Sequence, residues 1–367
     1  MKKSLVALSV LAASGAVMAQ SSVGLYGIAD AFVGSRQTTG ISLVGGNMVT
    51  LEQRQRVLDS GGLNGSRWGL KGAEDLGGGL KANFVLESGF DISNGASSGA
   101  LFDRQAFVGL SGNFGSVSLG RQYGAYDNVR GSFLSAQGNS PAFDATNGVP
   151  LTQTLVQYAV NGAFTLPPVN NPSVLLDINT AAVGSRVGAW AGYQARIDNS
   201  IRYETPNISG FQAAVVYGFG ENKSNAASAT KNASFSLTYA NGPVAVALVH
   251  QDDELGKDFH LKNTAIGGNY DLGLAKIFLA YNQAKYTGLA RQNEWSVGVR
   301  APLGATTLVA QYARSNGDDL GKSQSLGLSA EYSLSKRTTA YAGFNQTNAY
   351  QNLAKNNVFG LGVRHTF

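Results

Sequence analysis

Charged side chains in this chain recur within stretches that alternate between polar and apolar residues. Arg67, Gly69 and Lys71 share one face of such a stretch, and Trp68 and Leu70 take the other. A charge at the midplane of a lipid bilayer costs about 2–4 kcal/mol, so Arg67 and Lys71 must point away from lipid if this stretch crosses a membrane. The chemistry that suits such residues is the guidance of ions and polar solutes through water, which needs no catalytic group.

The same parity argument extends to other stretches of the chain. The residues that it directs away from lipid are Lys81, Asn83, Glu87, Arg202, Glu204 and Arg364. We therefore expect a wet interior that carries isolated charges.

Side chains that catalyse reactions are scarce. The chain has three histidines, His250, His260 and His365, and none is placed with a serine and an acid in a pattern that indicates a triad. Cysteine is absent, the glycines do not follow a phosphate-binding pattern, and no His/Asp/Glu cluster has metal-ligand spacing. We expect no enzymatic activity, no metal and no cofactor.

The N-terminus has the pattern of an export signal. Lys2 and Lys3 precede an apolar run, and Ala19 ends a small-residue cleavage site. Removal of residues 1–19 would leave residues 20–367 as one domain, and it would lower the net charge of +5 by two lysines to +3. That excess is too slight to indicate nucleic acid. An exported chain without cysteine needs another stabilising device, such as a large hydrogen-bonded sheet or oligomerisation.

Alternation with a period of two recurs along the whole chain. The stretch 325–334 sets leucine, alanine and tyrosine against serine, glycine and glutamate, whereas a helix would repeat near 3.6 residues. No stretch after residue 19 approaches the ~18 consecutive apolar residues of a membrane helix. The sixteen predicted strands are 23–34, 65–73, 79–90, 102–112, 115–122, 199–206, 210–219, 233–240, 243–250, 262–271, 275–286, 291–302, 306–314, 323–334, 338–346 and 358–367.

The connectors between these strands alternate in length. Short glycine turns, such as 77–79 and 303–305, take every second position. Longer polar loops fall between them, at 35–64, 91–101, 123–198, 220–232, 251–262, 287–291, 315–322 and 347–357. This layout, with an even number of strands close to ~9–11 residues long, predicts an all-β fold: a transmembrane, 16-stranded antiparallel β-barrel around an aqueous channel.

Several segments resemble those of a known family. They are Ser22–Asp30 (SVGLYGIAD), Ser66–Ala82 (SRWGLKGAEDLGGGLKA), Arg104–Gly112, Gly120–Gln122, Asp198–Pro206 (DNSIRYETP) and the terminal Arg364–Phe367 (RHTF). Together they resemble the trimeric, sixteen-stranded general porins of β-proteobacteria, of the neisserial, Bordetella, Burkholderia and Comamonas type. The resemblance spans the whole mature chain.

The resemblance implies a homotrimer in the cell outer membrane, in contact with lipid and lipopolysaccharide. Each barrel would be a separate channel for ions and small hydrophilic solutes. The third long loop, about 123–198 here, would fold inward and narrow the channel, and the stretch 160–189 has the composition of an insertion into that loop. Phe367 is expected to be part of the signal that the outer-membrane assembly machinery reads.

The resemblance also implies a basic cluster on the second, fourth and fifth strands, which maps to Arg67, Arg104 and Arg121. Arg104 has lipid-facing parity unless its strand starts later or bulges, and Gly120 could supply a bulge before Arg121. The opposing acids that the inward-folded loop offers are Asp127, Asp144 and Asp177. The expected constriction residues are Arg67, Lys71, Lys81, Arg104, Arg121, Asp127, Asp144 and Arg202.

Two other kinds of barrel stay open as alternatives. A substrate-specific channel would line its path with aromatic rings for sugars or with stacked arginines for anions. Most aromatic residues, such as Phe235, Tyr239, Trp295 and Tyr332, have lipid-facing parity, which is typical of membrane girdles instead. An adhesin or scaffold would use the long loops but would still be built on a pore. A general diffusion porin with weak anion preference fits the basic wall best.

Overall fold

Antiparallel strands make up almost all of the chain that the structure, a computed structural model, describes. The described residues are 22–44, 47–147, 149–150, 186–187, 192–220, 231–256, 259–287, 291–317, 321–349 and 354–367. The expected signal peptide, Asp177 and nearly all of the expected insertion at 160–189 lie outside them. No helix among the described residues has the length and apolar character that a membrane crossing requires.

One sheet contains the long strands. They are β1 (Ser22–Val44), β2 (Asn47–Ser60), β3 (Arg67–Gly77), β4 (Leu80–Gly89), β5 (Gln105–Gly112), β6 (Gly115–Tyr123), β9 (Arg196–Glu204), β10 (Phe211–Gly218), β11 (Lys231–Asn241), β12 (Val244–Gly256), β13 (Phe259–Asp271), β14 (Lys276–Tyr286), β15 (Gln292–Leu303), β16 (Thr306–Gly317), β17 (Gly321–Ser333), β18 (Thr338–Ala349) and β19 (Ala354–Thr366). The elements between β6 and β9 are short: α2 (Ala125–Val129), the π-helix η1 (Arg130–Leu134), β7 (Val149–Pro150) and β8 (Arg186–Val187).

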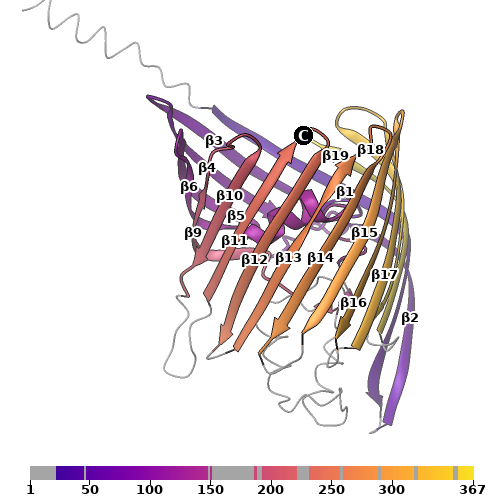
Figure 1. The fold of residues 1–367 in the computed structure, drawn as a ribbon. Helices are drawn as coiled ribbons and strands as arrows, with labels where there is room; N and C mark the ends of the chain where they lie inside the picture. Colours follow the sequence, from indigo (N-terminus) through magenta and orange to yellow (C-terminus); the bar gives the residue numbers. More distant parts are fainter. Residues whose placement is uncertain are drawn as a thin grey trace, which may run out of the picture.

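The sheet closes on itself because β19 pairs with β1 (Figure 1). β2 and β3 occupy a single position in the wall, since β2 pairs with 31–44 of β1 and β3 pairs with 22–28 of the same strand. The result is a closed 16-stranded antiparallel β-barrel, which confirms the predicted fold. The short turns gather with the C-terminus at one end of the barrel, which we call the short-turn end (Figure 1).

The predicted loop at 35–64 is wrong for most of its length. Residues 35–44 continue β1, residues 47–60 form β2, and only 61–66 separate β2 from β3. Polar pairs join this extension, including an Arg36–Asp59 ion pair of 2.5 Å. The polar runs 35–40 and 52–56 lack the apolar alternation that marks the other strands, so no strand was expected here. The ends of β12, β13 and β16–β19 exceed their predicted bounds in the same way.

The two faces of the wall differ in chemistry. Val215, Leu279 and Leu328 expose 54%, 60% and 40% of their surface on the face that we call outer. The opposite, inner face carries serine, asparagine, glutamine, glycine and charged residues. Two aromatic pairs, Phe211–Tyr239 beside the short turns and Trp295–Tyr312 toward the long loops, mark the ends of the apolar band, as girdle residues do.

An apolar core lies inside the barrel. Tyr126 and Leu134, from α2 and η1, pack with Val216 and Val249 on the inner face of β10 and β12. Figure 1 shows α2 and η1 about halfway along the strands. The segment after β6 is therefore held against the wall by buried apolar contacts.

Candidate pore constriction

Two arginines share one glutamate on the inner face of β3–β6. The Glu87 side chain, which is 5% exposed, lies 2.7 Å from Arg104 Nε and 3.6 Å from Arg67 Nε. The Tyr26 hydroxyl donates to Glu87 at 3.0 Å, and Arg104 donates to the Tyr123 hydroxyl at 2.6 Å. We call these five residues the Glu87 cluster. With two cations and one anion, the cluster leaves a net positive charge on this part of the wall.

Arg104 reaches the cluster because β5 begins only at Gln105, three residues after its predicted start and one residue after Arg104. Its side chain is thus free of the strand parity that would send it toward lipid. Arg121 differs. A bulge does occur at Gly120, where φ is +133° and the register shifts before Gln122. It turns Gln122 inward, to Ser118 and Ser200, while Arg121 stays in register with Ala106 on the outer face.

Arg121 forms an ion pair with Asp198, which is 66% exposed, and donates to the Asp103 carbonyl at 2.6 Å. The structure therefore does not bring Arg121 to Arg67 and Arg104, contrary to the expected basic cluster.

Three other expected basic residues lie on the inner face at different heights. Arg202 pairs with Glu204 and donates to the Tyr123 carbonyl at 3.3 Å, which places it beside the Glu87 cluster. Lys71 lies over the Tyr26 ring, 5.0 Å from its centroid. Lys81 pairs in register with Asp75, eight residues along β3 from Arg67. At ~3.4 Å per residue, Lys81 is about 27 Å farther down the wall, close to the short turns.

The segment 124–147 contacts the inner face along its length. The Ser135 hydroxyl donates to Gln311 Oε1 at 2.9 Å, and the Ser140 hydroxyl donates to the Gly62 carbonyl at 2.7 Å. The Phe143 ring lies against Gly343, where a Cβ atom would come within 2.5 Å of the ring. Only glycine at 343 leaves room for this ring, so strand and segment fit each other closely.

Within this segment, Arg130 and Asp144 form a buried pair. Their side chains are 4% and 0% exposed and meet at 2.8 Å. Asp144 also accepts from the Thr146 N–H at 2.9 Å and from the Ser135 hydroxyl at 3.2 Å. Burial raises the pKa of the Asp144 carboxyl above its ordinary value, and Arg130 acts in the opposite direction. Asp144 is thus engaged inside the segment. The sequence led us to expect a carboxylate that faces water in the constriction, and the structure does not place Asp144 there.

Asp127 has a different environment, because it is only partly buried. The Tyr193 hydroxyl donates to Asp127 at 2.7 Å, and the amide of the exposed Asn139 lies 3.4 Å away. Burial raises the pKa of Tyr193, so its hydroxyl stays protonated and acts as a donor. Of the two expected acids that the structure describes, Asp127 and Asp144, Asp127 is the one that is not fully buried.

Sequence reasoning missed several inner-face groups. Glu87 has the inward parity, but nothing in its pattern shows that two arginines share it. Arg300 binds Glu331 through two contacts, 3.1 and 2.7 Å, on the wall across from β3–β6. Alternation alone could have found this pair. Arg130 lies in a loop, where no parity rule applies.

In the described part of the chain, no three His, Cys, Asp or Glu side chains gather as metal ligands.

The terminal residue Phe367 closes the seam between the first and last strands. Its N–H and C=O exchange hydrogen bonds with Gly27 at 3.1 and 3.0 Å. The ring covers Gly27, where a Cβ atom would lie 2.4 Å from the ring edge, and remains 44% exposed.

Comparison with known proteins identifies the family of this chain. A model described as Gram-negative porin matches residues 5–352. The chain belongs to this porin family. Outer membrane porin protein 32 of Delftia acidovorans is 34% identical over 360 residues, covering 93% of this chain and 88% of that protein. An outer membrane porin protein of Bordetella pertussis is 30% identical, with both chains covered in full (100%).

A solved porin structure has the same fold. An anion-selective porin from Comamonas acidovorans superposes with a TM-score of 0.73 at 26% identity, covering 95% of this porin and 100% of that one. The predicted family is confirmed, and so is the placement of this porin in the outer membrane. Its function is that of an outer-membrane diffusion channel.

Proposed function

We propose that this porin passes ions and small hydrophilic solutes down their gradients, with a weak preference for anions. The observation that carries the preference is the Glu87 cluster, in which Arg67 and Arg104 share a single carboxylate. On the opposite wall Arg300 is matched by Glu331, so the two walls differ in net charge. A field of this kind acts on ions in water without binding them tightly. The anion selectivity of the Comamonas porin supports the proposal.

We further propose that segment 124–147 narrows the path between the two walls. Its support is the set of contacts to the inner face, from Ser135 to Gln311 and from Phe143 to Gly343. The exposed polar residues of the segment, Asn128, Ser132 and Asn139, would then face the passing solutes together with Arg67. Arg67, Arg104, Arg202 and Asp127 form the constriction in this proposal, while Lys71 and Lys81 line the path toward the short-turn end.

The test is the reversal potential of single channels in a planar bilayer under a salt gradient. Arg67→Glu reverses one charge of the Glu87 cluster, and we expect the reversal potential to move toward cations. Lys81→Glu is the matched control: it makes the same change of charge near the short turns and should produce a smaller shift. Equal shifts in the two variants, or none in Arg67→Glu, would remove Arg67 from the constriction.

A substrate-specific anion channel is the second candidate. The observation in its favour is that Arg67, Arg104 and Arg202 lie within one neighbourhood of Tyr123 rather than spread around the wall. Added phosphate or a small dicarboxylate distinguishes the two functions. A general porin conducts in proportion to salt and is indifferent to such solutes, whereas a specific channel shows saturable block.

We also infer that the porin catalyses no reaction. His250 and His365 lie on the outer face, bonded to Thr264 at 2.8 Å and Thr338 at 3.0 Å, and His260 pairs with Asp252 at 2.7 Å. Both threonine contacts lie on the outer face, and among the described residues no hydrogen bond joins a carboxylate to His250 or His365 as a triad requires. The family, whose members are channels, supports the same inference.

In the membrane we propose a homotrimer surrounded by lipid and lipopolysaccharide and inserted by the outer-membrane assembly machinery. A barrel of the same fold, OmpT of Vibrio cholerae, is known in a trimer form. The exposed Phe367 ring is available to a receptor before the seam with Gly27 closes.

Deletion of Phe367 tests its role as an assembly signal. We expect the amount of heat-resistant oligomer in outer membranes to fall several-fold, because the terminal ring and its seam are lost together. Phe367→Tyr, which keeps an aromatic ring, should assemble normally. Wild-type levels of oligomer without Phe367 would refute the role.

A further inference from the structure

The connector between β2 and β3, residues 61–66, folds around the side chain of one aspartate. Asp30, on the inner face of β1, is wholly buried (0% exposed). Its carboxylate accepts hydrogen bonds from three successive backbone N–H groups, those of Gly62 at 3.0 Å, Leu63 at 2.9 Å and Asn64 at 2.7 Å. Hydrogen bonds to an ionised acceptor are stronger than neutral ones, so the connector is held firmly on Asp30.

The main chain of Asp30 holds both ends of the same connector. The Gly61 N–H donates to the Asp30 carbonyl at 2.8 Å, and the Ser66 hydroxyl donates to the same carbonyl at 3.0 Å. The Asp30 N–H in turn donates to Ser66 Oγ at 3.1 Å. One residue of β1 therefore fixes the beginning, the middle and the end of connector 61–66.

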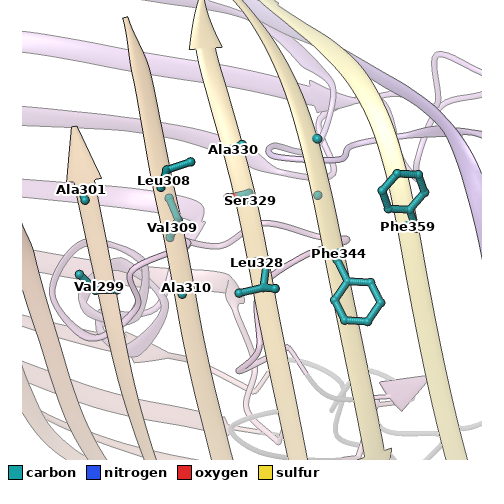
Figure 2. Close-up of a pocket in the computed structure, with 12 residues that line it drawn as sticks. Val299, Ala301, Leu308, Val309, Ala310, Leu328, Ser329, Ala330, Phe344 and Phe359 are labelled. Atoms are coloured by element: carbon teal, nitrogen blue, oxygen red, sulfur yellow. The ribbon is translucent and has the colours of Figure 1, made fainter. Parts of the chain in front are cut away.

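A tyrosine from the other side of the seam donates to the same carboxylate. The Tyr341 hydroxyl, from β18, reaches over β19 to Asp30. Gly62 leaves room for it, because a Cβ atom at residue 62 would collide with this hydroxyl. β18 thus presents Tyr341 to the interior, while Phe344 points to the outer face beside Phe359 of β19 (Figure 2).

Two carbonyl groups of the connector contact two different parts of the proposed constriction. The Gly62 carbonyl accepts from the Ser140 hydroxyl of segment 124–147 at 2.7 Å. The Gly65 carbonyl accepts from Arg67 Nη1, in the Glu87 cluster, at 3.3 Å. A single short connector therefore touches both the segment and the arginine that lies across the path from it.

Apolar packing joins the same parts a second time. The Phe143 ring, in segment 124–147, has its centroid 5.7 Å from that of Phe32 and 6.0 Å from that of Tyr341. Leu63 of the connector belongs to the same buried cluster. Tyr341 thus contacts Asp30 through its hydroxyl and the segment through its ring, so the connector cannot move without disturbing the segment.

We propose that Asp30 is a positioning residue for transport. By holding connector 61–66 it sets where segment 124–147 and Arg67 lie relative to each other, and so fixes the width of the path and the strength of the anion preference together. Asp30 is buried and touches no solute, so it acts only through the connector. The inference rests on the proposed narrowing of the path by segment 124–147. It assigns to Asp30 a task distinct from that of the Arg130–Asp144 pair, which lies within the segment.

The sign of the expected change in selectivity separates this role from an effect of charge alone. Asp30→Asn removes a negative charge from the inner wall, and that loss by itself would move the reversal potential toward anions. Release of the connector has the opposite effect, because the field of Arg67 weakens with distance and with screening in a wider aqueous path. We therefore expect Asp30→Asn to lose anion preference and to gain conductance.

The test is single-channel recording of the assembled porin in planar bilayers, with the reversal potential and the occupancy of each conductance level measured. In Asp30→Asn an amide nitrogen faces backbone donors. The occupancy of wider levels relative to the normal level should rise about tenfold, which corresponds to about 1.4 kcal/mol and is close to the usual contribution of a hydrogen bond to a charged group. Tyr341→Phe keeps the charge and the ring but removes one donor, so it should act in the same direction and less strongly.

Two matched variants serve as controls for the occupancy of the wider levels. Asp91→Asn changes a carboxylate that also accepts from a backbone N–H, that of Ser93 at 2.8 Å, but within its own exposed loop. Tyr332→Phe removes a hydroxyl from an exposed tyrosine on the outer face. Neither variant should change the occupancy.

A double-mutant cycle distinguishes positioning from a purely structural role at the seam. Ser140→Ala removes the hydrogen bond from the segment to the Gly62 carbonyl. The effects of Asp30→Asn and Ser140→Ala on occupancy should be less than additive in the double variant, because each change releases the same contact. A lower melting temperature with unchanged conductance levels and reversal potential in Asp30→Asn would overturn the proposal.

The proposal stays testable where Asp30→Asn yields no assembled porin. Tyr341→Phe then decides, and conductance levels and a reversal potential equal to those of the wild type would overturn the proposal. Arg67→Glu is recorded beside these variants. A reversal potential that moves in Arg67→Glu but in neither Asp30→Asn nor Tyr341→Phe would remove the role of Asp30 and leave the proposed transport function standing.

Discussion

The Glu87 cluster and the Arg130–Asp144 pair both join arginine to a carboxylate inside the barrel, yet they differ in number and in exposure. Glu87 is shared by two arginines, and the Arg67 side chain remains 23% exposed. Arg130 has a carboxylate of its own, and both side chains are almost wholly buried. The first arrangement leaves a charge where water reaches it, and the second leaves none.

This difference separates two tasks that charged residues perform in a channel. An unbalanced, partly exposed cluster creates a field in the path and can sort ions. A balanced, buried pair contributes little field, but it ties residue 130 to residues 144–146 and so fixes the fold of the segment between them. Replacing Glu87 should therefore change ion selectivity, whereas replacing Asp144 should change how firmly segment 124–147 is held.

The largest effect is expected from Asp144→Ala. Removal of one partner from a buried ion pair leaves an uncompensated charge and typically costs about 3–5 kcal/mol, which here would fall on the docking of segment 124–147. The barrel itself should persist, because its strand pairing does not involve Asp144. We expect a larger and noisier single-channel conductance.

Asp127→Ala provides the matched control for this variant. Asp127 is partly exposed and contacts Tyr193 and Asn139, so its loss should alter conductance less. Identical, quiet conductance in Asp144→Ala and the wild type would show that the buried pair does not hold the segment.

A smaller effect is expected from a change in the Glu87 cluster, and it should fall on selectivity rather than on conductance. Glu87→Gln keeps the size of the side chain but leaves Arg67 and Arg104 without their carboxylate, so the net charge of the cluster rises by one. The reversal potential should move toward anions while the mean conductance changes little. Glu254→Gln makes the same change of charge on the outer face and should leave selectivity unaltered. A shift of equal size in both variants would mean that only the overall charge of the protein matters.

Much of the fold follows from the sequence because lipid imposes an alternation on every strand that crosses it. Strands such as 291–302 and 306–314 were recognisable from that pattern, and their structural counterparts β15 and β16 begin within one residue of the predicted positions. The extension formed by 35–44 and 47–60 escaped because its polar runs, 35–40 and 52–56, lack the apolar alternation of the other strands. The pattern thus reports contact with lipid and not strand structure as such.

The candidate site was harder to predict for a related reason. Arg67 and Lys71 could be placed on the inner face by parity alone, because they lie within a regular strand. The side chain of Arg104 depends on where β5 begins, and that of Arg121 on which residue the bulge at Gly120 turns inward. Asp144 lies in a segment without periodicity, so nothing in the sequence pairs it with Arg130, fourteen positions earlier.

The smallest effect is expected from salt concentration, which should act on the exposed Glu87 cluster and not on the buried Arg130–Asp144 pair. Electrostatic screening shortens from about 10 Å at 0.1 M salt to about 3 Å at 1 M, and it acts on charges that water reaches far more than on buried pairs. The anion preference, measured as a reversal potential at a fixed salt ratio, should therefore decline with salt toward that of Arg67→Gln/Arg104→Gln. The conductance noise should not rise, because the Arg130–Asp144 pair is shielded from the solution. An anion preference that survives at 1 M salt in the wild type and is absent from the double variant would instead mean that the cluster contacts the ion directly. Conductance noise that grows with salt would mean that segment 124–147 is held by exposed charges.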